Sequence, residues 1–207
     1  MVSILEKLKQ LEEEEIERLG KNPFLGYPSI TPTVLQAPVK GEPQLNVVPY
    51  QCRALLDIRT IPGQSHETLK KQLEDIVREE ERSINESLHS GPLREIRESI
   101  EKGLSKGFLF EAKLHILEER PWTKTSQDES IVQAVSRAYR SVTGEEPIYG
   151  GVAGATDGTF LSAWAEIPIV TLGAGKWTIP HQKDEWVSID DLYLTAKIYA
   201  ASVLEYL

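Results

Sequence analysis

The end of the chain carries the feature that most constrains its fold. A glycine-rich turn at 150–158 is followed by an apolar run at 167–172, and then by a single histidine, His181, in a polar loop. A short apolar run between turn signals is typical of a buried strand in an α/β layer. Loops beyond the carboxyl ends of such strands present metal- and substrate-binding groups. The pattern therefore predicts a central strand at 167–172 with functional side chains on either side of it.

Composition places the chain among ordinary globular proteins and excludes several functions. Its 207 residues are enough for one sizeable domain or two small ones. The net charge of −9 disfavours nucleic acid or an anionic membrane as a partner. No apolar stretch approaches the roughly 20 residues of a membrane span, and the acidic, helical N-terminus is unlike a signal peptide. We therefore expect a cytoplasmic protein without nucleic-acid or membrane partners.

The single cysteine, Cys52, excludes an internal disulfide and cysteine-rich zinc sites. It lies in a strand-like run, on the same side as Ala54 and Leu56. We therefore expect a buried structural thiol rather than a nucleophile.

The first part of the chain alternates helical and strand-like periods. The elements we expect are a helix at 3–19 with a solvated charge run at 12–15, strands near 30–37 and 45–60, a helix capped by Ser65, a second helix near 93–104, and a half-buried strand at 107–118. A sheet with helices on one face is the natural two-layer arrangement for this order. The predicted fold class is α/β (α+β), with a ferredoxin-like unit that lacks its first strand.

The second part reads as the closing portion of an α/β layer. It contains a helix at 128–142, a short helix at 160–164, the apolar strand at 167–172, and a final helix. That helix begins at Ser188, with Asp191 completing a capping box and Leu192, Ala196, Tyr199 and Val203 on the inner side. We predict a boundary between domains 1–118 and 119–207.

Two residues near the apolar strand are the strongest chemical candidates. His181 follows Pro180 on a loop, where an imidazole suits zinc, and an exposed loop histidine is the alternative. Asp157 lies in a glycine-rich turn whose amides can approach an anion, and the alternative is an N-cap for the helix near 160. A self-contained metal site would have to use these two with Asp184 and Glu185.

Other polar residues have weaker patterns. Arg59 shares a strand face with Asp57, so it either binds a substrate carboxylate or forms an ordinary ion pair. Asn46 opens the same strand and is also a plausible turn residue. Three histidines have no partner at ligand spacing and receive no role: His66, His89 and His115.

Four stretches, taken in order, carry a family resemblance. Residues 46–64, 154–161, 167–175 and 179–192 resemble the zinc peptidases and deacylases typified by acetylornithine deacetylase and succinyl-diaminopimelate desuccinylase. The resemblance implies that 1–118 is most of a lid and dimerisation domain, and that 119–207 is the last segment of the α/β catalytic domain.

The resemblance also implies roles for individual residues. His181 matches the final zinc ligand, and Asn46 and Arg59 are similar to lid residues that reach a substrate, often across a dimer. Thr156 and Asp157 match the substrate-facing turn, although Thr159 stands where many relatives have arginine.

The other metal ligands and the general base of that family lie upstream of the matching stretches, so we assign no catalytic residue within this chain. The resemblance implies a metal-dependent hydrolase of N-acyl amino acids or small peptides, present as a fragment or split subunit that is inactive alone. Zinc, cobalt or manganese would bind only with ligands from another chain. The expected partners are a second copy through the lid and a separately encoded N-terminal half. The alternative is a non-catalytic dimerisation or substrate-binding module.

Overall fold

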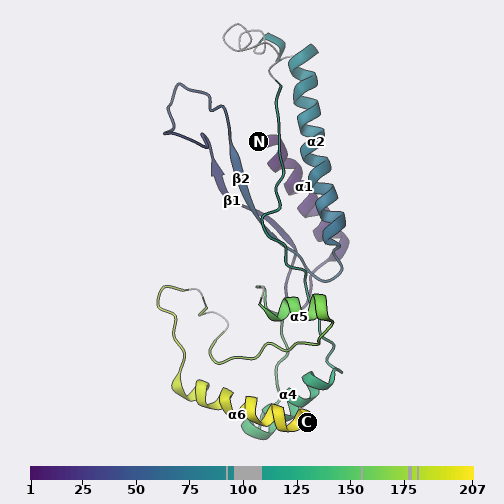
Figure 1. Ribbon diagram of the computed structural model, residues 1–207, viewed down its shortest axis with the longest axis vertical. Helices are drawn as coiled ribbons and strands as arrows, with labels where there is room; N and C mark the ends of the chain where they lie inside the picture. The colour runs from purple at the N-terminus through teal and green to yellow at the C-terminus, as the bar shows by residue number, and fades with distance from the viewer. Residues whose placement is uncertain (92, 96–108, 155, 177–178, 181) are drawn as a thin grey trace. The chain divides into compact units, whose positions relative to one another are not determined.

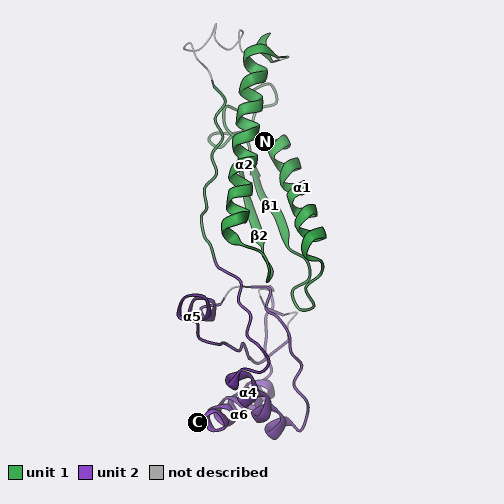
Figure 2. Cartoon of the chain, turned by 90° about the vertical axis from the view of Figure 1, so that its right-hand side faces the viewer, with its two compact units in different colours: residues 1–119 green, residues 120–207 purple. Residues whose placement is uncertain are grey.

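The chain forms two compact units, Met1–Glu119 and Arg120–Leu207 (Figure 2). This computed structural model describes residues 1–91, 93–95, 109–154, 156–176, 179–180 and 182–207. The lid and catalytic assignments of the two parts stay predictions, and each unit is described by itself.

Unit 1 has two layers, a helix pair and a small sheet (Figure 1). Its elements are α1 (Val2–Leu19), β1 (Ser29–Gln36), β2 (Arg53–Arg59) and α2 (His66–Ser90). Gly20 ends α1 with a positive φ, and the Ser65 hydroxyl caps α2 by accepting from the Thr68 N–H at 3.2 Å. The predicted α/β class is confirmed, with helices against a two-stranded sheet.

The core of unit 1 lies where both helices meet the sheet. Apolar residues at helical spacing on α1 and α2 point to the same face and bury against β1. The buried cluster comprises Ile4, Leu8, Leu11, Ile30, Leu69 and Leu73. Half-buried Leu56 and Ile58 of β2 complete it from the sheet. Helix periodicity in the sequence therefore located this core correctly.

The sheet is an antiparallel pair with one irregularity. Ser29 pairs with Arg59 at one end and Gln36 with Arg53 at the other, and the register shifts between Pro32 and Val34. Proline has no N–H to donate to the ladder, so a bulge beside it is the expected accommodation.

Two carboxylates of the predicted solvated run fasten α1 to the rest of the unit. The Ile30 N–H donates to Glu12 Oε1 at 2.9 Å, and Gln64 Nε2 donates to buried Glu15 Oε2 at 2.8 Å. Arg18 donates twice to the same Glu15 carboxylate. The prediction of a solvated face was wrong for Glu12 and Glu15, because partners distant in sequence meet them.

Residues 109–118 form an extended segment instead of the predicted strand. Phe110, Ala112 and Leu114 are half-buried, as the alternation predicted, but side chains of α2 bind the backbone in place of a neighbouring strand. Most of the predicted helix near 93–104 lies outside the described residues.

The predicted long strand at 45–60 begins only at Arg53. Residues 37–52 connect β1 to β2 without regular structure beyond turns, and Cys52 in this connection is exposed. The prediction of a buried thiol was therefore wrong. Because β2 begins at Arg53, Cys52 lies one residue outside the strand, in the exposed connection.

Unit 2 is built on two packed helices, α4 (Ser130–Thr143) and α6 (Ile189–Tyr206), with the short α5 (Gly158–Ala165) (Figure 1). Small buried residues on α4, Ala134 and Ala138, let α6 approach through Ile198 and Ser202. Arg137 of α4 donates to the Glu205 carboxylate at 2.7 Å. Ser188 caps α6 by accepting from the Asp191 N–H at 2.9 Å, as the sequence predicted.

Two buried surfaces predicted for unit 2 are exposed. Residues 167–172 form no ladder with any described strand, and Ile167 is 48% exposed. The predicted inner face of α6 is also exposed, with Tyr199 at 50% and Val203 at 58%. The physical reason is shared: within the described chain, α4 covers the other side of α6 and no sheet covers these residues.

We predict that Glu15→Gln removes part of the acid sensitivity of unit 1. Hydrogen bonds from Arg18 chiefly hold the pKa of Glu15 below its usual range, against burial, which raises it. A depressed pKa gives stability that is present above the ordinary value of about 4.3 and is lost as pH falls through the folded pKa.

At neutral pH the variant should therefore lose roughly 1–3 kcal/mol of unfolding free energy, and the loss should shrink toward about pH 3. Urea denaturation followed by far-ultraviolet circular dichroism measures it. Glu13→Gln, on the exposed neighbouring residue, is the control. Equal pH dependence in wild type and Glu15→Gln would contradict the prediction.

Candidate functional site

Arg59 ends β2 with an exposed side chain. Its Nε donates to Asp57 Oδ2 at 2.7 Å, so the ion pair expected for this strand face is present. Both side chains are about half exposed, at 55% and 46%, and such a pair contributes little stability.

Asn46 lies in the exposed connection between β1 and β2. The Val47 N–H donates to the Gln44 carbonyl at 3.3 Å, which places Asn46 within a turn. Several large apolar residues near it in the chain have side chains exposed to solvent, including Leu45, Val48 and Tyr50. The turn interpretation of Asn46 is confirmed, and its contact with a substrate stays a prediction.

Thr156 and Asp157 form the turn that opens α5. The Thr159 N–H donates to the Thr156 carbonyl at 3.0 Å, and the Phe160 N–H donates to the Asp157 carbonyl at 3.1 Å. Asp157 occupies the N-cap position in αR conformation, yet its side chain makes no capping hydrogen bond. The exposed carboxylate of Asp157 therefore does not cap α5 and is able to bind another group.

Gly158 holds this turn against the apolar segment at 167–172. A Cβ built on Gly158 would lie 3.1 Å from Ile169 Cδ1 and 3.3 Å from Thr156 Oγ1. Both contacts are tighter than ordinary van der Waals separations, so a side chain at this position would require Ile169 to shift. The segment and the Asp157 turn are thus in direct contact within unit 2.

Thr125 holds the other side of the same segment. Its hydroxyl donates to the Ile169 carbonyl at 2.7 Å, and the Ile169 N–H donates back to that hydroxyl at 3.3 Å. One side chain therefore satisfies both backbone groups of a residue that the sequence placed in a central strand.

His181 lies outside the described residues, so its predicted ligand role is untested. Its neighbourhood contains a turn in which the Gln182 N–H donates to the Ile179 carbonyl at 3.2 Å. Across the described ranges, no three His, Cys, Asp or Glu side chains come together as a metal site would require. Nothing in the described residues tests the alternative of a self-contained site that includes His181.

One histidine given no role by the sequence forms specific contacts. His66 Nδ1 lies 3.0 Å from Glu119 Oε1, and His66 Nε2 lies 2.9 Å from Thr60 Oγ1. Glu119 is 53 residues away in the chain, so no spacing rule could have found this pairing.

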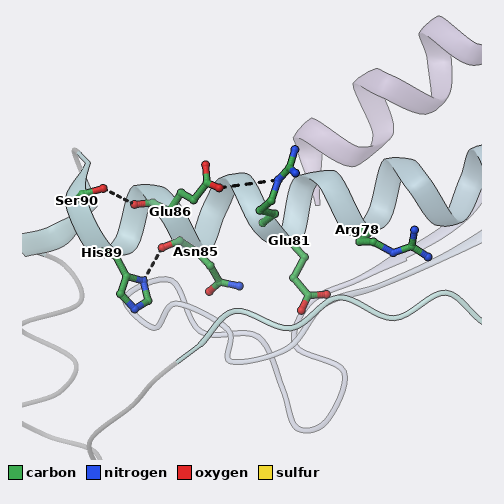
Figure 3. Close-up of a pocket in the computed structure, with 7 residues that line it drawn as sticks. Arg78, Glu81, Asn85, Glu86, His89 and Ser90 are labelled. Atoms are coloured by element: carbon green, nitrogen blue, oxygen red, sulfur yellow. Dashed lines mark hydrogen bonds and ion pairs between the residues drawn. The ribbon is translucent and has the colours of Figure 1, made fainter.

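Two hollows lie among the described residues of unit 1, and neither offers the predicted site residues a substrate-sized space. An open hollow of about 490 Å³ lies along α2, and none of the predicted site residues lines it (Figure 3). A second cavity borders Arg59 but has only about 10 Å³, less than a substrate needs.

Comparison with known proteins gives a family match over nearly the whole chain. The model of peptidase family M20/M25/M40 matches residues 8–205. No helix among the residues described is both long and apolar enough to span a bilayer.

Two solved structures share the fold. A metallo-carboxypeptidase of the M20 family from Sulfolobus solfataricus aligns with a TM-score of 0.55 and 20% identity, over 97% of this chain and 44% of its own. The di-peptidase Dug1p from Saccharomyces cerevisiae aligns with a TM-score of 0.59 and 16% identity, over 94% of this chain and 35% of its own. The chain thus spans less than half the length of either structure.

We predict that Gly158→Ala destabilises unit 2, because the new methyl group must displace Ile169. The cost should be about 1–3 kcal/mol, as for other overpacked sites. Ile169→Val removes the Cδ1 atom nearest the new methyl, so the double variant should recover part of the loss. Thermal unfolding followed by tryptophan fluorescence reports on unit 2, which contains every tryptophan of the chain. Additive effects of the two substitutions would refute the packing argument.

Proposed function

Because the chain belongs to peptidase family M20/M25/M40, we propose that it forms part of a metal-dependent amide hydrolase. The proposed substrates are N-acyl amino acids or small peptides. The match over 8–205 carries this proposal, since it includes both compact units. The residues of the four sequence stretches favour the deacetylase and desuccinylase branch, whereas the two solved structures are a carboxypeptidase and a di-peptidase.

The chain would supply part of the proposed active site. His181 would supply one ligand for zinc, cobalt or manganese, and the remaining ligands and the general base would come from the upstream part of the family's catalytic domain, on the same or another polypeptide. When bound, the metal supplies an activated water. A single imidazole fits one ligand position of such a metal centre, which needs further protein ligands.

Other residues of the chain would bind and orient the substrate. Asp157 is suited to a substrate amino group, because its carboxylate is exposed and does not cap α5. Thr156 adds a hydroxyl beside it. Arg59 is suited to a substrate carboxylate because its guanidinium is about half exposed, and Asn46 would add an amide from the neighbouring connection.

The apolar surface of unit 2 supports the N-terminal half of the catalytic domain as its covering. Thr125 and Tyr199 already bind the backbone of Ile169 and Leu172, so strand pairing would use the other backbone groups of 167–172. The exposed face of α6 offers Leu192 and Val203. Apolar patches of this kind mark interaction surfaces. The remaining strands of an α/β layer are the covering that would satisfy both the backbone and the side chains.

We predict that hydrolysis requires the family's upstream metal ligands in addition to this chain. The chain would be assayed with zinc on N-acetylornithine, N-succinyl-diaminopimelate and an unmodified dipeptide, alone and with a polypeptide that carries the family's upstream ligands. Activity and stoichiometric zinc should occur only in the mixture. His181→Ala should abolish zinc retention and hydrolysis, whereas His89→Ala, on α2, should leave both intact. Hydrolysis by the chain alone, or none by the mixture, would overturn the proposal.

A second candidate function is a non-catalytic dimerisation or substrate-binding module. It is favoured by unit 1, which has its own core and an exposed apolar connection at 45–50. Homodimerisation through this unit is proposed in either case.

Light scattering should therefore give twice the mass of the chain. Val48→Lys, which charges a residue 91% exposed, should shift the protein toward monomer without unfolding it. Lys40→Glu, on an exposed residue of the same connection, is the control for a change of surface charge. A dimer unaffected by Val48→Lys would exclude this surface. A dimer without hydrolysis in any mixture would favour the module.

A further inference from the structure

The extended segment at 109–119 is attached to α2 through side chains. Asn85 makes a two-way bond with Phe110: Asn85 Nδ2 donates to the carbonyl at 2.9 Å, and the Phe110 N–H donates to Oδ1 at 2.8 Å. The Ala112 N–H donates to Glu81 Oε2 at 3.3 Å. Figure 3 shows Asn85 and Glu81 pointing from α2 toward this side. These contacts hold the beginning of the segment.

The end of the segment is held by a separate set of contacts around Glu119. Oε1 of Glu119 lies 3.0 Å from His66 Nδ1, and Oε2 accepts from the Lys70 ammonium. His66 Nε2 in turn lies 2.9 Å from Thr60 Oγ1. These four residues all belong to unit 1, and they connect the end of β2, the first turn of α2 and the last residue before the second unit.

The proton arrangement makes this set of contacts self-consistent. Hydrogen bonding from Lys70 chiefly lowers the pKa of Glu119, with His66 acting in the same direction, so the carboxylate is ionised and only accepts. His66 must then carry its proton on Nδ1. A neutral ring accepts from the Thr60 hydroxyl at Nε2, and a charged ring donates to it. Both bonds survive in either state of the imidazole.

The helix end favours the same arrangement. Glu119 brings its negative charge to the first turn of α2, where the unsatisfied N–H groups favour an anion. Lys70, one turn further along, provides the opposite charge. The His66 side chain is 19% exposed and the Glu119 side chain 36%, so solvent screens the carboxylate more than the imidazole.

We propose that Thr60, His66, Lys70 and Glu119 form a clasp that couples the junction between the two units to the strand end carrying Arg59. Glu119 is the last residue of unit 1, and Thr60 directly follows Arg59. A change in the path of the backbone at Glu119 is therefore transmitted through His66 to Thr60 at that strand end. These four residues position other groups and are not placed in contact with a substrate. The coupling would alter substrate binding through Arg59, and only this consequence rests on the function proposed above.

Hydrogen exchange measured by mass spectrometry on the full chain tests the coupling. Glu119→Gln keeps the shape of the side chain but removes its charge. Amide exchange should rise about threefold to tenfold in 113–119 and also in 59–66, and stay unchanged in 109–112. Asn85→Ala should give the opposite pattern, with faster exchange near 109–112 only. Glu74→Gln, an exposed carboxylate on α2, is the matched control.

A second variant keeps the test decisive if Glu119→Gln lowers global stability. Thr60→Val preserves the shape of the side chain and leaves the contact between Lys70 and Glu119 intact. Amide exchange should become faster in 59–66. The NMR chemical shifts of the His66 ring nitrogens should report the lost contact at Nε2. Faster exchange confined to 113–119 in Glu119→Gln would overturn the coupling, and no change in either region would overturn the clasp. Because these measurements need no substrate, a failure of the hydrolase assay leaves them unaffected.

Discussion

Burial of two helix faces against a two-stranded sheet is the interaction on which unit 1 depends. A pair of strands alone is marginally stable in water, so β1 and β2 need the apolar faces of α1 and α2 to persist. Once these faces meet, Glu12 and Glu15 are brought to backbone and amide donors that fix the position of α1. The polar contacts are consequences of the apolar packing and specify its geometry.

Local signals in the sequence located the helices well. Ser65 and Ser188 begin α2 and α6, and Gly20 ends α1, because capping and the left-handed turn depend on residues a few positions apart. Strands were harder to predict, because they depend on a neighbour that need not be close in sequence. The run at 167–172 has the composition of a central strand, but its identity as one depends on groups that the described chain does not place beside it.

The candidate site divides in the same way. The exposure of Asp157 followed from a glycine-rich turn, which is a local property, although the absence of a capping bond could not be read from the residues. The contacts of His66 were missed because they join positions that only the folded chain brings together. Its sequence neighbours carry no metal-like spacing, so the histidine had no signal of its own.

The hydroxyl of Thr125 has a consequence for how a partner would bind unit 2. By holding both backbone groups of Ile169, it fixes that part of 167–172 before any strand arrives. A segment already fixed loses less conformational entropy on association than a flexible one. Thr125 therefore acts as a preorganising contact that lowers the entropic cost of pairing with the segment.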